Sequence, residues 1–239
     1  MEVFLLAAGL GTRLRPLTNN RPKALVEVNG HSLLELNINN LISQGATRIV
    51  INIHHFGEQI IDFINNRKWD TEIIISDERN LLLDTGGGLK HAMDLFSKKN
   101  PILIHNVDIL SYIDLKDLML QHSHSKSIAT LAVSNRTTSR YLLFNNQNQL
   151  IGWHNAKTGE YRWSNQPTNT YISHAFSGIA VIEPELLQLL PEEKPYPIIP
   201  EYLKIAKNHI INCIEHNPAD WLDVGKPETL KQAEQWYKI

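Results

Sequence analysis

The sequence predicts a three-layer α/β/α fold built around a mixed, mainly parallel sheet with a small antiparallel insertion. Three observations carry this prediction. Short apolar runs without polar alternation recur through the first 110 residues, as in strands that are covered on both faces. Segments with apolar residues at helical spacing separate them, and such strand–helix alternation is typical of parallel sheets. The second half contains short runs separated by turn residues, which predicts antiparallel strands.

The elements of the first half follow one another regularly. The pattern predicts strands at residues 3–7, 48–53, 72–76 and 101–105. It predicts helices at residues 32–43, 57–66 and 85–96. Apolar and β-branched residues dominate each strand. In the first helix, apolar residues recur at helical spacing until Gly45, where a helix would stop. The second helix turns Ile60, Ile61 and Ile64 inward, and the third opens with glycines.

The second half is less regular. The pattern predicts a helix at 115–123, a strand at 127–134, short antiparallel strands within 140–163, a long strand at 171–182, a loop at 191–200, a helix that includes 203–207, a strand at 210–215 and a closing helix at 227–237. Asn145-Asn146 and Thr158-Gly159 mark turns between the short strands. Four prolines interrupt regular structure in the predicted loop.

The composition excludes several classes of protein. The 239 residues are 42% hydrophobic and 20% charged, which is ordinary for a globular protein. The net charge is −2 and no basic run is present, so we expect neither a nucleic-acid nor a membrane partner. No signal peptide or membrane-spanning run is visible. Cys213, the single cysteine, fits a reducing compartment, and we expect a cytoplasmic protein.

The first predicted strand runs into a loop of small and basic residues. Gly9 and Gly11 let backbone N–H groups approach an anion closely, because no Cβ stands in the way. Arg13 and Lys23 add positive charge around the same point. The loop lacks the Walker pattern, and Leu14 stands where a dinucleotide fingerprint needs its third glycine. The loop predicts a site that grips the phosphates of a nucleoside triphosphate.

Two aspartates are candidates for a metal site. Asp108 follows a predicted strand, at the carboxyl end where ligands bind in open α/β sheets. Asp223 stands between Leu222 and Val224, where an unpaired buried charge would be costly. Mg²⁺ is typically held by one or two carboxylates together with substrate phosphates. We therefore expect the pair to bind Mg²⁺, with Mn²⁺ as a substitute; an aspartate that caps a turn is the alternative for Asp108.

Three successive glycines, residues 86–88, follow Asp84 and Thr85 ahead of a helix. Glycine permits close backbone approach to a flat ligand, and a helix N-terminus favours anions. Because glycine weakens a helix, these residues need a compensating reason. A nucleobase and ribose site is one reading of the segment, and a flexible turn is the alternative.

The chain shares motifs with a known family. The pattern L-A-A-G-x-G-T-R-L-x-P-L-T-x-x-x-P-K over residues 6–23 resembles the N-terminal signature of the sugar-1-phosphate nucleotidyltransferases. The run D-V-G-K-P-E from Asp223 to Glu228 resembles a late motif of that family, and Asp108 matches its strand-end metal aspartate. Val107 departs from the family's usual glycine. The run D-T-G-G-G at Asp84 is similar to E-T-G-G-G of short N-acetylmuramate 1-phosphate uridylyltransferases.

The resemblance implies a Rossmann-like, nucleotide-diphospho-sugar transferase-like fold and a magnesium-dependent transferase reaction. A sugar 1-phosphate oxygen attacks the α-phosphorus of a nucleoside triphosphate, and pyrophosphate leaves. Arg13 would hold the pyrophosphate end, Lys23 would stabilise phosphoryl charge, and the metal would sit on Asp108 and Asp223. We expect one domain over 1–239, with a nucleotide-binding half (1–110), a sugar-binding half (111–239) and no C-terminal β-helix domain.

The resemblance also implies the contacts of each substrate. Nucleotide contacts are expected at Leu6, Ala7, Ala8, Gly9, Gly11, Thr12, Arg13, Thr85, Gly86 and Gly87. Sugar-phosphate contacts are expected at Asn106, Lys157 and Gly178. Gly178 belongs to a segment that resembles the family's strand under the hexose. No E-K-P motif surrounds Lys157, so a solvated loop lysine is its alternative.

The substrates remain open among several pairs. The triple glycine and short chain favour UTP with N-acetylmuramate 1-phosphate or another hexose 1-phosphate, but guanylyl-, thymidylyl- and cytidylyltransferases share the N-terminal signature. A glycosyltransferase would use D-x-D, where this chain has Asn106-Val107-Asp108. A non-catalytic, sugar-nucleotide-binding regulatory subunit would be expected to lack one of the site's charged residues. We expect a monomer or a homodimer.

Overall fold

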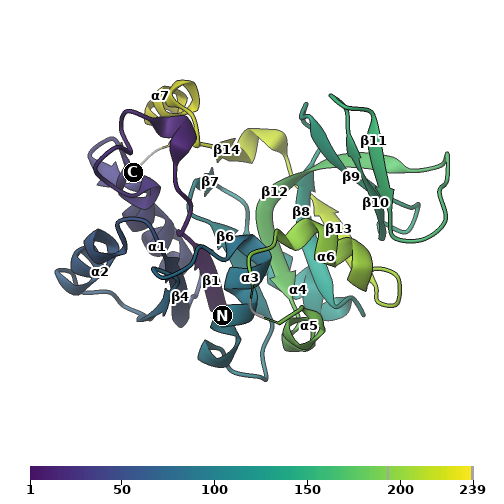
Figure 1. Cartoon of the computed structure of the whole chain (residues 1–239), viewed down its shortest axis with the longest axis horizontal. Helices are drawn as coiled ribbons and strands as arrows, with labels where there is room; N and C mark the ends of the chain where they lie inside the picture. The colour runs from purple at the N-terminus through teal and green to yellow at the C-terminus, as the bar shows by residue number, and fades with distance from the viewer. Residues whose placement is uncertain (193, 238–239) are drawn as a thin grey trace.

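A computed structural model describes residues 1–192 and 194–237, and its central feature is a ten-stranded sheet (Figure 1). The strands of this sheet are β1 (Glu2–Leu6), β4 (Arg48–Ile53), β5 (Glu72–Asp77), β6 (Ile102–Asn106), β8 (Ala129–Ser134), β9 (Arg140–Phe144), β10 (Leu150–Asn155), β11 (Glu160–Trp163), β12 (Ile172–Ile182) and β13 (Ile211–Glu215). Two short ladders lie apart from it: β2 (Glu27–Val28) with β3 (His31–Ser32), and β7 (Ile109–Ser111) with β14 (Trp221–Asp223).

Helices occupy the connections between these strands. The α-helices are α1 (Leu33–Ser43), α2 (Gly57–Asn65), α3 (Asp84–His91), α4 (Leu115–His124), α5 (Pro184–Leu189), α6 (Ile198–Ile205) and α7 (Pro227–Trp236). Short 3₁₀ helices are η1 (Thr12–Leu14), η2 (Lys23–Leu25), η3 (Ala92–Leu95) and η4 (Pro218–Asp220). Among the described residues, no helix is long and apolar enough to cross a bilayer.

Four parallel strands form the core of the sheet, in the order β6-β1-β4-β5. Phe4 of β1 lies opposite Val50 of β4 on one side and Ile104 of β6 on the other. The chain therefore leaves β1 toward β4 and later returns to the opposite side of β1 to form β6. Ligands of open α/β sheets bind at the carboxyl ends of strands where the order reverses in this way. The fold thus places a binding site beyond the ends of β1 and β6.

Helices cover both faces of this sheet. The side chains of β1 alternate, so that Val3 and Leu5 join a core cluster with residues of α1, α2 and α4, while Phe4 joins a cluster with residues of α3, α5 and α6. The result is a three-layer α/β/α arrangement, which confirms the predicted fold class.

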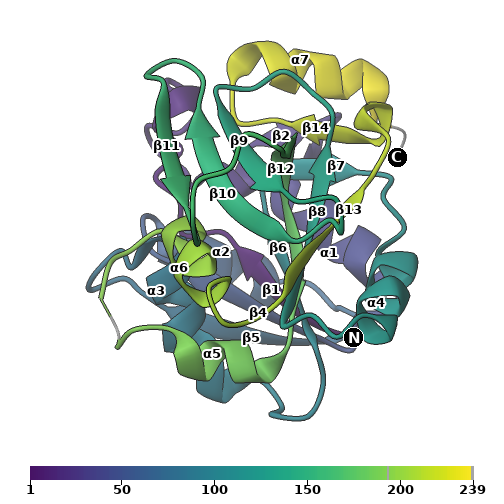
Figure 2. The same cartoon turned by 90° about the vertical axis from the view of Figure 1, so that its right-hand side faces the viewer.

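The predicted antiparallel insertion is also present. Strands β9, β10 and β11 pair antiparallel and join the main sheet through β12. Figures 1 and 2 show this small sheet at the same end of the molecule as α7. The strands of both halves share one sheet, and this continuity supports the single-domain expectation, which stays a prediction.

The β7–β14 ladder was not predicted, and it determines where the site forms. Asp223 of β14 lies opposite Ile109 of β7. A third core cluster, which includes Leu14, Leu110 and Leu222, packs residues of α7 and these strands against the loop that follows β1. This ladder carries the end of the chain back to the carboxyl end of β6.

Several predicted boundaries were wrong; the helix predicted at 85–96, for example, is α3 followed by the 3₁₀ helix η3. The loop predicted at 191–200 ends early, because α6 begins at Ile198. Pro200 lies in the first turn of α6, where the backbone N–H that proline lacks would have no partner within the helix. The helix predicted to include 203–207 accordingly ends at Ile205. Helix α5, which has Pro184 at its first position, was missed.

Candidate active site

The loop after β1 combines an open backbone with a fixed lysine. A Cβ built on Gly9 would meet nothing within 4 Å, so no protein packing requires glycine there. Gly11 has a φ of +63°, and a Cβ on it would lie 3.0 Å from both Lys23 Cβ and Thr18 Cγ2. Gly11 is therefore needed for the turn and for the close packing of the Lys23 stem against it.

Four charged side chains predicted from distant segments come together beside this loop. Lys23 Nζ donates to Asp108 Oδ2, and both side chains are nearly buried, with exposures of 12% and 13%. Arg13 lies 3.7 Å from Asp108 and 3.7 Å from Asp223, between the two carboxylates. The Arg13 side chain is 53% exposed, so it stays open to a ligand. Two carboxylates and two cations thus share one surface.

Backbone contacts hold the two aspartates in register. The Val224 N–H donates to the Asp108 carbonyl at 2.9 Å, and the Gly225 N–H donates to Asp223 Oδ1 at 2.7 Å. A Cβ on Gly225 would lie 2.6 Å from Arg13 Nη2. The glycine of the D-V-G-K-P-E run therefore leaves room for the Arg13 guanidinium beside Asp223.

A cavity of about 590 Å³ opens onto this cluster. The predicted residues that line it are Leu6, Ala8, Gly9, Gly11, Thr12, Arg13, Lys23, Thr85, Asn106 and Asp108. Its lining also includes Asn52, Glu78, Leu82, Asp84, Val107, Pro195 and Gly225, which connect the glycine-rich loop with the start of α3. The predicted residues outside this lining are Ala7, Gly86, Gly87, Lys157, Gly178 and Asp223.

Asn52 and Glu78 were missed from sequence, and they fix the loop. Asn52 Oδ1 accepts the N–H groups of Ala7 and Ala8 at 2.7 and 3.2 Å, and its Nδ2 donates to Glu78 Oε1 at 2.7 Å. Glu78 Oε2 in turn accepts the N–H of Leu83, just before α3, at 3.1 Å. Burial raises the pKa of the Glu78 carboxyl, while the bonds from Asn52 and Leu83 oppose that rise. The network links the β1 loop to α3.

A signal for Asn52 was present in the sequence. It stands in an otherwise apolar run, residues 49–53, and is 2% exposed. A polar side chain buried within a central strand needs hydrogen-bond partners, and here the partners belong to the predicted phosphate loop. Glu78, just after β5, follows the same strand-end rule that identified Asp108.

Substitution of Asn52 tests this connection. We expect Asn52→Ala to weaken nucleotide binding about 10-fold and to lower the unfolding free energy by about 1–3 kcal/mol, because two loop N–H groups and Glu78 lose their partner. Calorimetric titration with UTP and denaturant unfolding measure the two effects. Asn39→Ala, at an exposed position of α1, is the control; equal UTP affinity in both variants would show that Asn52 does not organise the loop.

The glycines of α3 serve a different contact from the predicted one. The N–H groups of Gly86 and Gly87 both donate to the Tyr196 carbonyl, at 2.9 and 3.3 Å. Side chains on these residues would strike Tyr196 and the Lys194 carbonyl. The close backbone approach that glycine permits is therefore used by the chain itself, and the structure does not bring Gly86 or Gly87 to the cavity. The helix also begins at Asp84, ahead of the glycines.

Thr85 makes two kinds of contact. It lines the cavity, while its Oγ1 accepts the N–H of Ile198 at the start of α6, at 2.9 Å. The Thr85 hydroxyl thus anchors α6, and its contact with a nucleotide stays a prediction.

Gly178 and Asn106 lie against each other. Gly178 has a φ of +72°, and a Cβ on it would lie 2.8 Å from Asn106 Nδ2. The glycine leaves room for the Asn106 side chain, which lines the cavity. Gly178 thus packs directly against the Asn106 side chain.

Lys157 is not part of this arrangement. It lies exposed in the turn between β10 and β11, where its N–H donates to Asn155 Oδ1 at 3.0 Å. The structure therefore does not bring Lys157 together with the other predicted residues. This position fits the alternative interpretation, a solvated loop lysine.

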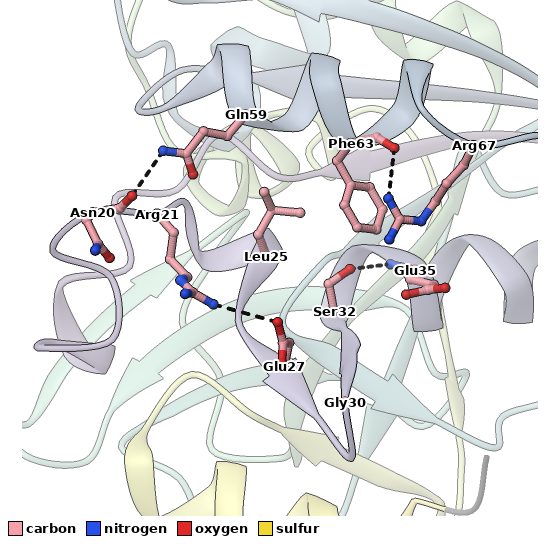
Figure 3. Close-up of a pocket in the computed structure, with 10 residues that line it drawn as sticks. All are labelled: Asn20, Arg21, Leu25, Glu27, Gly30, Ser32, Glu35, Gln59, Phe63 and Arg67. Carbon is pink, nitrogen blue, oxygen red and sulfur yellow. Dashed lines mark hydrogen bonds and ion pairs between the residues drawn. The ribbon is translucent and has the colours of Figure 1, made fainter.

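A second cavity lies on the other side of the Lys23 segment (Figure 3). Its volume is about 360 Å³, and none of the predicted site residues lines it. Arg21 is paired with Glu27 at 3.8 Å, and the Arg67 guanidinium lies 3.6 Å from the Phe63 ring centre. The glycine-rich loop, Lys23 and Asp108 line the first cavity and not the second, which distinguishes the first as the candidate active site.

Comparisons with known proteins identify the family of the chain. A family model described as Nucleotidyl transferase matches residues 2–151, a range that includes the glycine-rich loop, Lys23 and Asp108. The chain is 29% identical to N-acetylmuramate alpha-1-phosphate uridylyltransferase of Caulobacter vibrioides, over 97% of this chain and 94% of that protein. It is 27% identical to mannose-1-phosphate guanyltransferase of Pichia angusta, over 95% of this chain and 62% of that protein.

A solved structure shares the fold. HddC from Yersinia pseudotuberculosis, in a complex with GMP-PN, matches with a TM-score of 0.76 and 20% identity over 99% of both chains. The family match covers more than half of this chain and contains the loop and the first aspartate of the site. The chain therefore belongs to the nucleotidyl transferase family, among the sugar-1-phosphate nucleotidyltransferases.

Proposed function

We propose that the chain transfers a nucleotidyl group from UTP to a sugar 1-phosphate, with N-acetylmuramate 1-phosphate as the favoured acceptor, and releases pyrophosphate. One observation carries the reaction class. Arg13, Lys23, Asp108 and Asp223 come from three distant segments and meet beside a cavity at the ends of β1 and β6. This arrangement supplies paired cations for phosphates and paired carboxylates for a metal ion.

The residues present fit a divalent ion of the magnesium type. Asp108 and Asp223 offer oxygen ligands, and no cluster of three or more metal-binding side chains occurs within the described ranges 1–192 and 194–237. Two carboxylates suit Mg²⁺, because that ion usually completes its shell with water and substrate phosphates. When bound there, the ion would neutralise charge on the α-phosphate and the leaving group.

The chain's own cations have distinct positions in this reaction. Lys23 is nearly buried and held by Gly11 and Asp108, so its ammonium group is fixed before substrate arrives. It would stabilise charge that develops on the α-phosphoryl group. Arg13 is half exposed and borders the glycine-rich loop, which suits a bidentate contact with the departing pyrophosphate. The acceptor phosphate supplies the nucleophile, so the protein contributes position and charge.

The choice of substrates rests on similarity. The uridylyltransferase relative aligns with nearly the full length of this chain and of its own. A guanyltransferase relative also aligns with most of this chain, so the other bases of the family are the alternative. The proposal includes Mg²⁺ as the metal, Mn²⁺ as a substitute, and a cytoplasmic site of action. The oligomeric state, monomer or homodimer, stays a prediction.

Pyrophosphate release tests the proposal. The purified chain is assayed with UTP, GTP, dTTP, CTP and ATP against hexose 1-phosphates and phosphocholine, each with Mg²⁺ and with EDTA. Turnover that requires UTP, N-acetylmuramate 1-phosphate and metal supports the full proposal. Turnover with another pair corrects the substrates and keeps the reaction. Nucleotide binding without release from any pair favours a non-catalytic subunit instead.

A further inference from the structure

A bulge in β12 presents two backbone carbonyls beside the candidate active site. The pairing of β12 with β8 shifts register between Phe176 and Ala180, and Gly178 within this stretch has a positive φ. The Phe176 carbonyl accepts a hydrogen bond from Arg136 Nη2 at 2.8 Å. The Ser177 carbonyl accepts one from Trp221 Nε1 at 2.7 Å. The bulge thus positions an arginine and a tryptophan next to each other.

Arg136 is held in place with part of its donor capacity unused. Its guanidinium lies 4.1 Å from the centre of the Trp221 ring, a cation–π contact. Its Nε is buried and has no hydrogen-bond partner among the described residues. Burial lowers the pKa of Arg136, while attraction to Asp223 and Tyr141 raises it. Asp223 is therefore near enough to act on this charge. With Nη2 on the Phe176 carbonyl and Nε buried, Nη1 is the nitrogen that is neither buried nor hydrogen-bonded within the described part of the chain.

The position of Arg136 differs from that of the other cations. Arg13 and Lys23 approach the two aspartates from the glycine-rich loop and line the larger cavity. Arg136 follows β8 and contacts Trp221, two residues before Asp223, and it lies outside the lining of that cavity. In an in-line transfer the acceptor reaches the α-phosphorus from the side opposite the leaving group. Arg136 is a cation on the Trp221 side of Asp223, away from the loop expected to hold the triphosphate.

We propose that Arg136 binds the phosphate of the acceptor and places it for attack. This inference rests on the proposed function, because it takes a sugar 1-phosphate as the acceptor. A guanidinium presents parallel donors that match two oxygens of a phosphate. The contact with Trp221 and the hydrogen bond to the Phe176 carbonyl hold this guanidinium in place. The sequence-based candidate for this contact, Lys157, lies exposed in the β10–β11 turn. Arg136 therefore fills a role that was predicted for a residue elsewhere.

Substitution separates binding of the acceptor from structural support of the bulge. We expect Arg136→Gln to raise the KM for the sugar 1-phosphate about 10- to 100-fold, with the KM for the nucleoside triphosphate unchanged within about 2-fold. Arg136→Lys keeps the positive charge but loses the planar guanidinium group, so its KM for the sugar 1-phosphate should lie between those of the wild type and Arg136→Gln. Arg162→Gln is the matched control, because Arg162 lies 5.0 Å from the Trp153 ring on the inserted sheet, away from Asp223. It should leave both KM values unchanged.

The acceptor probes are glucose 1-phosphate, mannose 1-phosphate and N-acetylmuramate 1-phosphate, which all carry the phosphate. Calorimetric titration of each into the enzyme with Mg²⁺ provides a readout that needs no turnover. A similar loss with carboxylate-free and carboxylate-bearing acceptors supports a phosphate contact. A loss confined to N-acetylmuramate 1-phosphate would assign Arg136 to the carboxylate and overturn the phosphate role.

The remaining outcomes separate this inference from the proposed function. Unchanged acceptor affinity in Arg136→Gln, with wild-type turnover intact, would overturn the role of Arg136 and leave the reaction standing. A parallel rise in both KM values, or a lowered melting temperature with equal loss of UTP binding, would identify a structural role and also overturn it. A wild-type protein that releases no pyrophosphate but binds these acceptors through Arg136 would refute the transfer reaction alone. Wild-type protein that binds none of them would refute both.

Discussion

Lys23→Ala should lower kcat at least ~10²-fold while leaving the fold intact. In the wild-type chain the stem of Lys23 packs against Gly11 and its ammonium group contacts Asp108; the side chain is 12% exposed and lines the cavity. A cation fixed in this way stabilises developing charge on a phosphoryl group without reorganising during the reaction, and alanine removes it. Steady-state pyrophosphate release with the productive substrate pair measures the loss.

The structure specifies what should survive the substitution. Asp108 keeps Arg13 at 3.7 Å, so its charge is not left without compensation. The melting temperature should therefore change little, and activity should still respond to Mg²⁺. Lys231→Ala on the exposed surface of α7 is the control and should have full activity. Near-normal kcat in Lys23→Ala would remove this lysine from the mechanism.

Much of the sheet could be predicted from the sequence, because its buried strands carry their own pattern. β4, predicted at residues 48–53, forms at Arg48–Ile53, and β1 differs from its prediction by one residue at each end. Strands of this kind are continuous apolar runs between turn residues. β7 and β14 could not be found in the same way. Each has three residues, and each exists because it pairs with the other across more than 100 residues of chain.

The residues of the candidate site also fall into two groups, those that a local sequence pattern identifies and those that depend on contacts between distant segments. Arg13, Lys23 and Asp108 belong to local motifs, and the structure brings them together as predicted. Asn52 is invisible to motif reasoning, because its contribution depends on β4 lying beside β1. The triple glycine shows a different limit of motif reasoning, and its contact with a nucleotide stays a prediction. Its composition indicated a close backbone approach correctly, but the approaching group is the segment around Tyr196, which no local pattern identifies.

Asp108→Asn should abolish magnesium-dependent turnover. The carboxylate accepts from Lys23 and lies 3.7 Å from Arg13, and the β7–β14 ladder places Asp223 on the other side of the same arginine. An amide keeps the shape of the side chain but loses the charge that a magnesium ligand needs. Pyrophosphate release across a Mg²⁺ titration measures the effect. Asp94→Asn, an exposed residue that pairs with Lys98, is the control.

Nucleotide binding without metal should respond in the opposite direction. In the wild-type chain, the Asp108 carboxylate contacts the Lys23 ammonium group and lies 3.7 Å from Arg13, so it competes with a triphosphate for both cations. Its neutralisation frees both cations, so Asp108→Asn should bind UTP in EDTA at least as tightly as the wild type. Asp223→Asn should behave alike, and the double variant should be no less active than either single one if the two form one metal site. Retained magnesium-dependent turnover in Asp108→Asn would mean that the metal is held elsewhere. Weaker UTP binding by this variant in EDTA would show that the carboxylate positions the two cations instead of competing for them.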